Sequence, residues 1–278
     1  ATGSNRSDLM ALKKQGHIEL EKKEKIRNSL DKINIVVSKP PLLVEGQNKA
    51  WNLIREGFDL KTPKPFLLHG VTGSGKTEVY MRAVSETLLK GKQAIILVPE
   101  IALTVQTVRR FMDRFPDQVG LQHSKLSLGE RYDTWRRARS GKISILIGAR
   151  SALFAPLPNI GLIIVDEEHE EAYRQDPPVR PPYYNARDAA VQYSQILGSV
   201  CILGSATPDI SSTQLAKIGC YIKVDLPNRI MGHRDYLSNK SNVFGVKSTY
   251  KFIDDDNLTA QYIDLPKVDI VDMRHELR

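Results

Sequence analysis

The sequence has few cysteines and no long hydrophobic run. Its only two cysteines, Cys201 and Cys220, are too far apart for C-x-x-C spacing, so neither a disulfide framework nor a self-contained zinc site is predicted. No apolar stretch approaches the ~20 residues that cross a bilayer. The opening residues, ATGSNR, lack the apolar core of a secretion signal. These absences predict no membrane partner and a location in a reducing cytoplasm.

Acidic residues are outnumbered by basic ones. The 278 residues contain 40 Lys and Arg against 32 Asp and Glu, a formal charge of +8, which attracts polyanions without by itself identifying one. The chain is 41% hydrophobic and 26% charged, as in ordinary globular proteins. The length predicts one main domain with a smaller appendage.

Five segments differ in pattern. Residues 1–33 are typical of a short amphipathic helix followed by a small hairpin, a partial winged-helix unit; a disordered charged leader is the alternative. A linker follows at 34–41, and the main domain is expected at 42–226. Residues 227–264 are polar without a sustained period and predict a loop or insertion. Residues 265–278 resume strand-like alternation, as expected at the start of a connection to a further lobe.

Within the main domain, short aliphatic runs alternate with amphipathic stretches. Continuous apolar strands are typical of a parallel sheet buried on both faces, and the intervening helices supply its crossovers. The sequence therefore predicts an α/β three-layer domain with a mostly parallel sheet. The expected strands are 66–69, 94–98, 143–147, 162–165 and 200–203, and the expected helices are 45–56, 77–90, 102–115, 129–140 and 186–195.

A phosphate-binding loop lies between the first strand and its helix. Residues 70–77, GVTGSGKT, satisfy G-x-x-x-x-G-K-[ST] in the strand–loop–helix context that this motif requires. Main-chain N–H groups and the helix N-terminus are expected to hold phosphates, Lys76 to reach the β- and γ-phosphates, and Thr77 to ligate Mg²⁺. The predicted nucleotide-binding residues of the loop are Gly70, Thr72, Gly73, Ser74, Gly75, Lys76 and Thr77.

An acidic pair follows a second buried strand. Asp166 and Glu167 begin the run DEEH at the carboxyl edge of the sheet, where open α/β folds bind ligands. Asp166 is the expected Mg²⁺ partner, and Glu167 is expected to orient and deprotonate the attacking water.

The order of these motifs resembles that of superfamily 2 helicases, whose first lobe is RecA-like. GSATP at 204–208 supplies the next motif, and LVPEIALT, GARSALFAP and YNARDAA narrow the resemblance to the primosomal helicases that restart stalled replication forks. The similar region is roughly 42–226. The resemblance implies the ATP-binding lobe of an ATP-dependent 3′-to-5′ DNA helicase.

The resemblance also implies partners and further site residues. It implies single-stranded and forked DNA, single-strand-binding protein and primosome loading proteins as partners, a monomer, and a location at the bacterial nucleoid. Zinc is expected only in a cysteine-rich segment not contained in this sequence. Because such enzymes hydrolyse ATP between two lobes, we expect this stretch alone to be poorly active. Gln47 resembles the adenine-reading glutamine, and residues expected to contact DNA or couple it to hydrolysis are Pro99, Glu100, Thr104, Arg150, Ser151, Tyr173, Tyr183, Tyr184, Arg187, Ser205 and Thr207.

Two other interpretations stay open at this point. Another superfamily 2 DNA translocase would share the phosphate loop and the acidic pair without unwinding duplex. A nucleotide-gated module that binds DNA or protein without turnover would share the fold alone.

Overall fold

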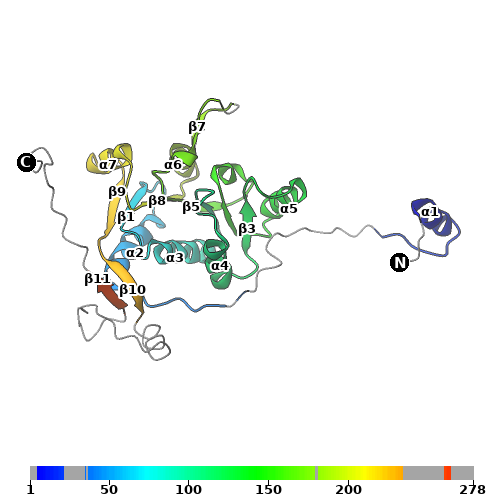
Figure 1. Ribbon diagram of the computed structural model, residues 1–278, viewed down its shortest axis with the longest axis horizontal. Helices are drawn as coiled ribbons and strands as arrows, with labels where there is room; N and C mark the ends of the chain where they lie inside the picture. The colour runs from blue at the N-terminus through cyan, green and yellow to red at the C-terminus, as the bar shows by residue number, and fades with distance from the viewer. Residues whose placement is uncertain (1–4, 22–34, 36, 179–180, 234–259, 264–278) are drawn as a thin grey trace, which may run out of the picture.

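The computed structural model describes residues 5–21, 35, 37–178, 181–233 and 260–263. Its main body is a seven-stranded sheet between two layers of helices (Figure 1). The helices are α1 (Arg6–Lys14), α2 (Glu45–Gly57), α3 (Lys76–Leu89), α4 (Val105–Arg114), α5 (Leu128–Arg139), α6 (Ala186–Leu197) and α7 (Ile210–Lys217), with 3-10 turns η1 (Arg150–Phe154) and η2 (Glu171–Tyr173).

All neighbouring strands of the large sheet are parallel. Their order is β3-β4-β2-β5-β8-β1-β9, so β8 separates the strand before the phosphate loop from the strand that carries the acidic pair. The strands are β1 (Phe66–Gly70), β2 (Gln93–Leu97), β3 (Val119–Gln122), β4 (Ile145–Gly148), β5 (Ile160–Asp166), β8 (Val200–Ser205) and β9 (Ile222–Leu226). The predicted α/β class with a parallel sheet is confirmed.

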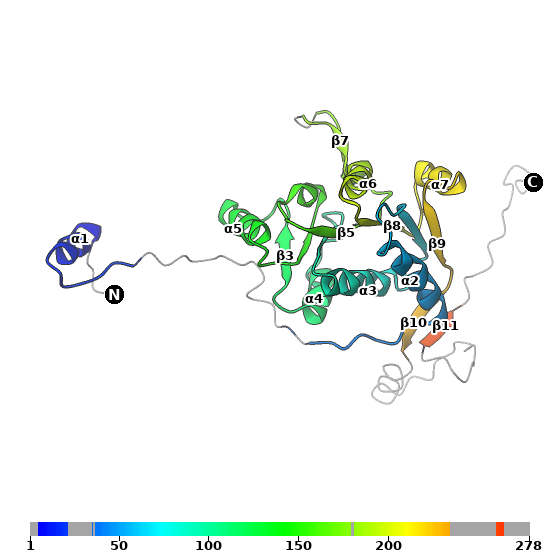
Figure 2. The same ribbon diagram turned by 180° about the vertical axis from the view of Figure 1, so that it is seen from behind.

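Helices cover both faces of this sheet (Figures 1 and 2). Side chains of α2, α3 and α4 pack on one face, and those of α5, α6 and α7 pack on the other. Alternate residues of each central strand therefore enter different cores: Leu68 lies in the first and Leu67 in the second, and both have no exposed surface. This two-sided burial explains the unbroken aliphatic runs in the sequence.

Local signals set the helix ends. Ser127 caps α5, where its hydroxyl accepts from the Glu130 N–H and the Glu130 carboxylate accepts from the Ser127 N–H. Asn185 caps α6 in the same way by accepting from the Arg187 N–H at 2.9 Å. Gly198, at φ +61°, ends that helix.

The structure adds strands that the sequence patterns did not reveal. β3 and β9 form the two edges of the large sheet. Within the expected loop at 227–264, β10 (Arg229–His233) pairs antiparallel with β11 (Ala260–Ile263). A short ribbon, β6 (Arg174–Gln175) and β7 (Tyr184–Asn185), projects after the acidic run.

The expected appendage at 1–33 is described in part. Helix α1 is present, with an Asn5 cap and no buried side chain, and Gly16 follows it at φ +77°. Most of the predicted hairpin lies outside the described residues, as does the segment expected at 265–278. No helix in the described part of the chain is long and apolar enough to cross a membrane.

Candidate nucleotide-binding and coupling site

The phosphate loop joins β1 to α3 through glycines in left-handed conformations. Gly73 and Gly75 have φ of +82° and +84°, which other residues adopt only with strain. A Cβ added to Gly75 would lie 2.1 Å from the Gln47 side-chain nitrogen. Both backbone angle and close approach therefore require glycine at position 75.

Lys76 is held across the mouth of this loop. The residue is 8% exposed, its Nζ donates to the Gly70 carbonyl at 2.8 Å, and the same nitrogen lies 3.8 Å from Glu167 Oε1. Lys76, predicted to bind phosphates, and Glu167, predicted to act on the attacking water, thus face each other at one end of the sheet.

These groups line one cavity of about 720 Å³, a size typical of ligand sites. Its walls come from the phosphate loop, the start of α2 and α3, the acidic pair, the side of α4 and the segment before α2. The lining includes Ser38, Lys39, Pro41, Gln47, Val71, Thr72, Gly73, Ser74, Gly75, Lys76, Thr77, Glu78, Met81, Arg110, Asp113, Arg114, Asp166, Glu167 and Ile230.

Gln47 occupies the junction of α2 with the phosphate loop. Its Nε2 donates to the Gly75 carbonyl at 3.3 Å, and its Oε1 accepts from the Val44 N–H at 3.2 Å. A primary amide has a second N–H and a second lone pair, so one donor and one acceptor of Gln47 remain for a ligand.

Asp166 ends β5 beside a buried tyrosine. The Tyr80 hydroxyl donates to Asp166 Oδ1 at 2.8 Å, and the Tyr173 hydroxyl donates to the Asp166 carbonyl at 2.6 Å. Burial raises the pKa of the Asp166 carboxyl, and the Tyr80 hydrogen bond opposes that rise. Glu167 follows at φ +47°, an uncommon angle for a side-chain-bearing residue, and its carboxylate extends toward Lys76.

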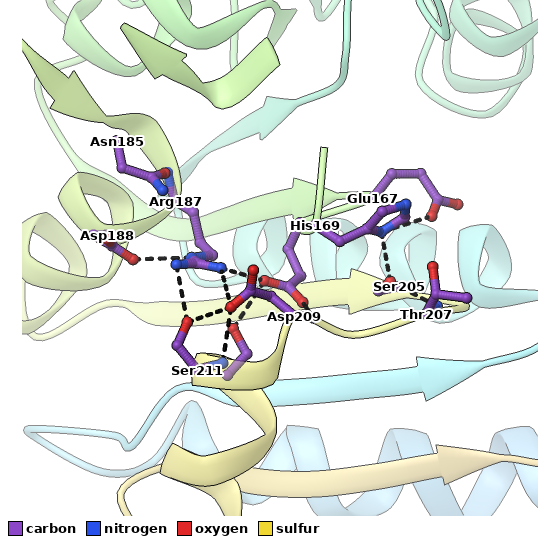
Figure 3. Close-up of polar contacts among 11 residues, drawn as sticks. Glu167, His169, Asn185, Arg187, Asp188, Ser205, Thr207, Asp209 and Ser211 are labelled. Carbon is purple, nitrogen blue, oxygen red and sulfur yellow. Dashed lines mark hydrogen bonds and ion pairs between the residues drawn. The ribbon is translucent and has the colours of Figure 1, made fainter. Parts of the chain in front are cut away.

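A hydrogen-bonded chain links the acidic run to the GSATP segment (Figure 3). His169 Nδ1 lies 3.7 Å from Glu167 Oε2 and 2.7 Å from the Ser205 hydroxyl oxygen. That same oxygen accepts from the Thr207 N–H at 2.9 Å. The chain crosses directly from β5 to β8 because these strands are neighbours in the sheet.

Glu168 is the centre of a second, buried cluster that the sequence patterns did not indicate. The residue is 2% exposed and accepts from Arg187 Nη1 at 3.2 Å, the Asp209 N–H at 2.8 Å and the Ser212 hydroxyl at 2.8 Å. Arg187 also lies 3.3 Å from Asp209 Oδ1. Figure 3 shows the Arg187 guanidinium directed toward Asp188, Asp209 and Ser211. The cluster ties α6 and α7 to the acidic run.

Two sequence predictions need correction here. Tyr173 is 1% exposed and packs in the second core, so its ring cannot stack on DNA bases. Arg187 is 6% exposed and paired with the buried Glu168, so it does not contact DNA directly, and its expected role in coupling stays a prediction. Tyr183 is 54% exposed, and Tyr184 packs edge-on against Phe154 with ring centroids 5.3 Å apart.

The remaining expected DNA-path residues lie near the same edge of the sheet. Thr104 caps α4 through the Thr107 N–H, and Glu100 accepts from the Ser124 hydroxyl at 3.1 Å. Arg150 Nη1 donates to the Arg174 carbonyl at 2.6 Å. Pro99 is buried, whereas Ser151 is exposed. Arg150 is therefore already bonded to the ribbon that follows the acidic run.

The fold and site define a nucleotide-binding helicase domain. Residues 44–216 match the family model described as DEAD/DEAH box helicase, and the chain belongs to that family. It is 38% identical to replication restart protein PriA of Bacillus subtilis over its whole length, which covers 30% of that protein.

A second relative carries the same name, and a solved structure has a similar fold. The PriA protein of Chlamydia pneumoniae is 44% identical over 81% of the chain, again covering 30% of the relative. The structure of RecG bound to a three-way DNA junction matches 74% of this chain and 28% of its own, with 23% identity and a TM-score of 0.51, a likeness of fold alone. The chain thus spans about a third of the length of these curated relatives.

Proposed function

We propose that this chain is the ATP-binding lobe of an ATP-dependent DNA helicase that acts in replication restart. The observation that carries the proposal is the approach of Lys76 Nζ to within 3.8 Å of Glu167 across a cavity lined by a glycine loop. A cation for phosphate and a carboxylate for water are the two groups that phosphoryl transfer to water requires.

Each residue has a role in this proposal. The loop N–H groups and Lys76 bind the phosphates, and Glu167 orients and deprotonates the attacking water. Thr77 and Asp166 line the same cavity. One hydroxyl and one carboxylate fit Mg²⁺, which keeps several waters and takes further ligands from phosphates. When bound, the cation would neutralise charge that develops on the phosphates.

The family resemblance supports single-stranded and forked DNA as the substrates. Relatives that share 38% and 44% identity are named replication restart proteins. We include 3′-to-5′ polarity, a monomeric state, single-strand-binding protein and primosome loading partners, and a nucleoid location in the cytoplasm as parts of the same proposal.

The exposed Tyr183 and the partly exposed Tyr184 remain candidates for base stacking. They lie at the ribbon of β6 and β7, to which Arg150 is bonded through the Arg174 carbonyl. Base stacking on aromatic side chains contributes about 1–3 kcal/mol per base and tolerates sequence changes.

Titration of the chain with Mg²⁺ and ATP by calorimetry tests the proposal. Lys76→Ala should weaken binding roughly tenfold or more, because a hydrogen bond to a charged group is worth about 1.5–3 kcal/mol. Lys217→Ala is the matched control, since Lys217 is exposed at the end of α7 and does not line the cavity. Absence of saturable ATP binding in the unaltered chain, or equal binding by both variants, contradicts the proposal.

Glu167→Gln separates a motor from a nucleotide-gated module. In a protein extended to include a second lobe, this substitution should abolish hydrolysis stimulated by forked DNA while ATP binding persists. DNA-stimulated hydrolysis that survives the substitution would exclude Glu167 as the base. The same assay on the 278-residue chain should show little turnover.

A further inference from the structure

The chain passes over the phosphate loop as it leaves β9. The Ile230 N–H donates to the Gly73 carbonyl at 2.9 Å. The Arg229 side chain lies against Gly73, with Nε 3.1 Å from the position that a Cβ would occupy there. Strand β10, which begins at Arg229, also pairs with β11 beside α2 (Figure 2). Both contacts fix the backbone of Ile230 relative to the loop.

This anchoring directs the Ile230 side chain into the nucleotide cavity. Ile230 is half-buried and lines the cavity, and its Cδ1 lies 3.1 Å from the position of a Cβ on Gly75. The Gln47 amide approaches the same position from α2. The side chains of Ile230 and Gln47 thus both lie against Gly75.

Such a pair has the chemistry of a base-binding subsite. Gln47 retains one N–H and one lone pair after its bonds to Gly75 and Val44, which matches a purine edge that offers an acceptor and a donor. An apolar side chain beside it removes the base face from water.

We infer that Ile230 is a nucleotide-contacting residue that packs on the face of the purine of a bound nucleoside triphosphate, with the base edge toward Gln47. The inference rests on the proposed ATP binding and adds a residue to that site. Ile230 lies beyond residues 44–216, which match the helicase family, and it belongs to the strand pair that follows the large sheet. Binding of the base would therefore couple the phosphate loop to this later segment of the chain.

A comparison of ligands with and without a base tests the inference. Calorimetry on the 278-residue chain would measure Mg²⁺–ATP and Mg²⁺–tripolyphosphate with Ile230→Ala, Ile230→Val and, as a matched control, Ile218→Ala, since Ile218 is 61% exposed and lies at the end of α7. Ile230→Ala should weaken ATP binding about five- to tenfold and leave tripolyphosphate binding within about twofold. Ile230→Val should restore most of the ATP affinity.

The outcomes separate this inference from the proposed function. Unchanged ATP affinity in Ile230→Ala, or equal weakening of ATP and tripolyphosphate, overturns the base contact. Retained tripolyphosphate binding shows that the variant is folded around its phosphate loop. Failure of the unaltered chain to bind ATP at all would instead reject the proposed function.

Discussion

The buried Arg187–Glu168 pair provides the sharpest test of how the acidic run is held. Their side chains are 8% and 0% exposed, with Nη1 and Oε2 separated by 3.2 Å. Arg187→Met removes the cation and leaves the Glu168 carboxylate with only the Asp209 N–H and the Ser212 hydroxyl. Removing one partner of a buried pair costs about 3–5 kcal/mol.

The lower end of that range, about 3 kcal/mol, is the appropriate expectation because two hydrogen bonds to Glu168 survive. For a domain of roughly 150–250 residues, each kcal/mol lowers Tm by about 2–4 °C. Arg187→Met should therefore lower Tm by roughly 6–12 °C, measured by circular dichroism at neutral pH without nucleotide.

A double-mutant cycle and a surface control complete the test. Glu168→Gln keeps an acceptor for the Asp209 N–H, so adding it to Arg187→Met should restore part of the lost stability, with a coupling free energy above about 1 kcal/mol. Arg109→Met removes an exposed arginine that forms a loose i,i+4 pair with Asp113 at 3.7 Å and should change stability by no more than about 0.5 kcal/mol. Equal Tm values for Arg187→Met and Arg109→Met, or strict additivity of the double variant, would refute the reasoning.

Three further substitutions have defined outcomes. Asp166→Asn should raise the free energy of unfolding without ligands by about 1 kcal/mol, since it keeps an acceptor for Tyr80 and removes a buried charge. Because burial raises the folded-state pKa of Asp166, the advantage of asparagine should be full at neutral pH and vanish at acid pH; denaturant titrations at several pH values would measure it. Tyr183→Ala should weaken binding of labelled oligothymidine by about 1–3 kcal/mol in fluorescence anisotropy, whereas an unchanged affinity removes Tyr183 from the DNA path. Gly73→Ala should weaken ATP binding in calorimetry, because φ +82° costs an alanine about 1–2 kcal/mol and its methyl group would meet Arg229.

The sequence patterns predicted the central sheet but not its edges. Ile163 and Ile164 lie in an unbroken aliphatic run because β5 is covered on both faces. At the edge, β9 alternates with exposed Lys223 and Asp225, a pattern that a search for continuous apolar runs misses. The pairing of β10 with β11 joins segments about 30 residues apart, and no local pattern carries that information.

The same distinction applies to the site. The phosphate loop and the acidic pair are contiguous motifs, so their residue types and spacing identify them. The cluster around Glu168 assembles residues from the turn after β5, from α6 and from α7, which meet because β5 and β8 are adjacent. Tyr173 is among the residues expected to contact DNA or couple it to hydrolysis, yet it is buried and its hydroxyl reaches the Asp166 carbonyl from within the core.

The position of β8 between β5 and β1 determines where the GSATP segment lies. Asp166 pairs with Gly204, and His69 pairs with Ser205, so the GSATP segment leaves the sheet between the phosphate loop and the acidic run. A movement of Glu167 toward or away from a bound phosphate would change its 3.7 Å approach to His169, which is bonded to Ser205. The same Ser205 oxygen accepts from the Thr207 N–H, so two hydrogen bonds connect His169 to the segment leading to α7. Both hydrogen bonds of this route lie at the carboxyl edge of the sheet, where Ser205 is the last residue of β8 and His169 and Thr207 lie on the segments that follow β5 and β8.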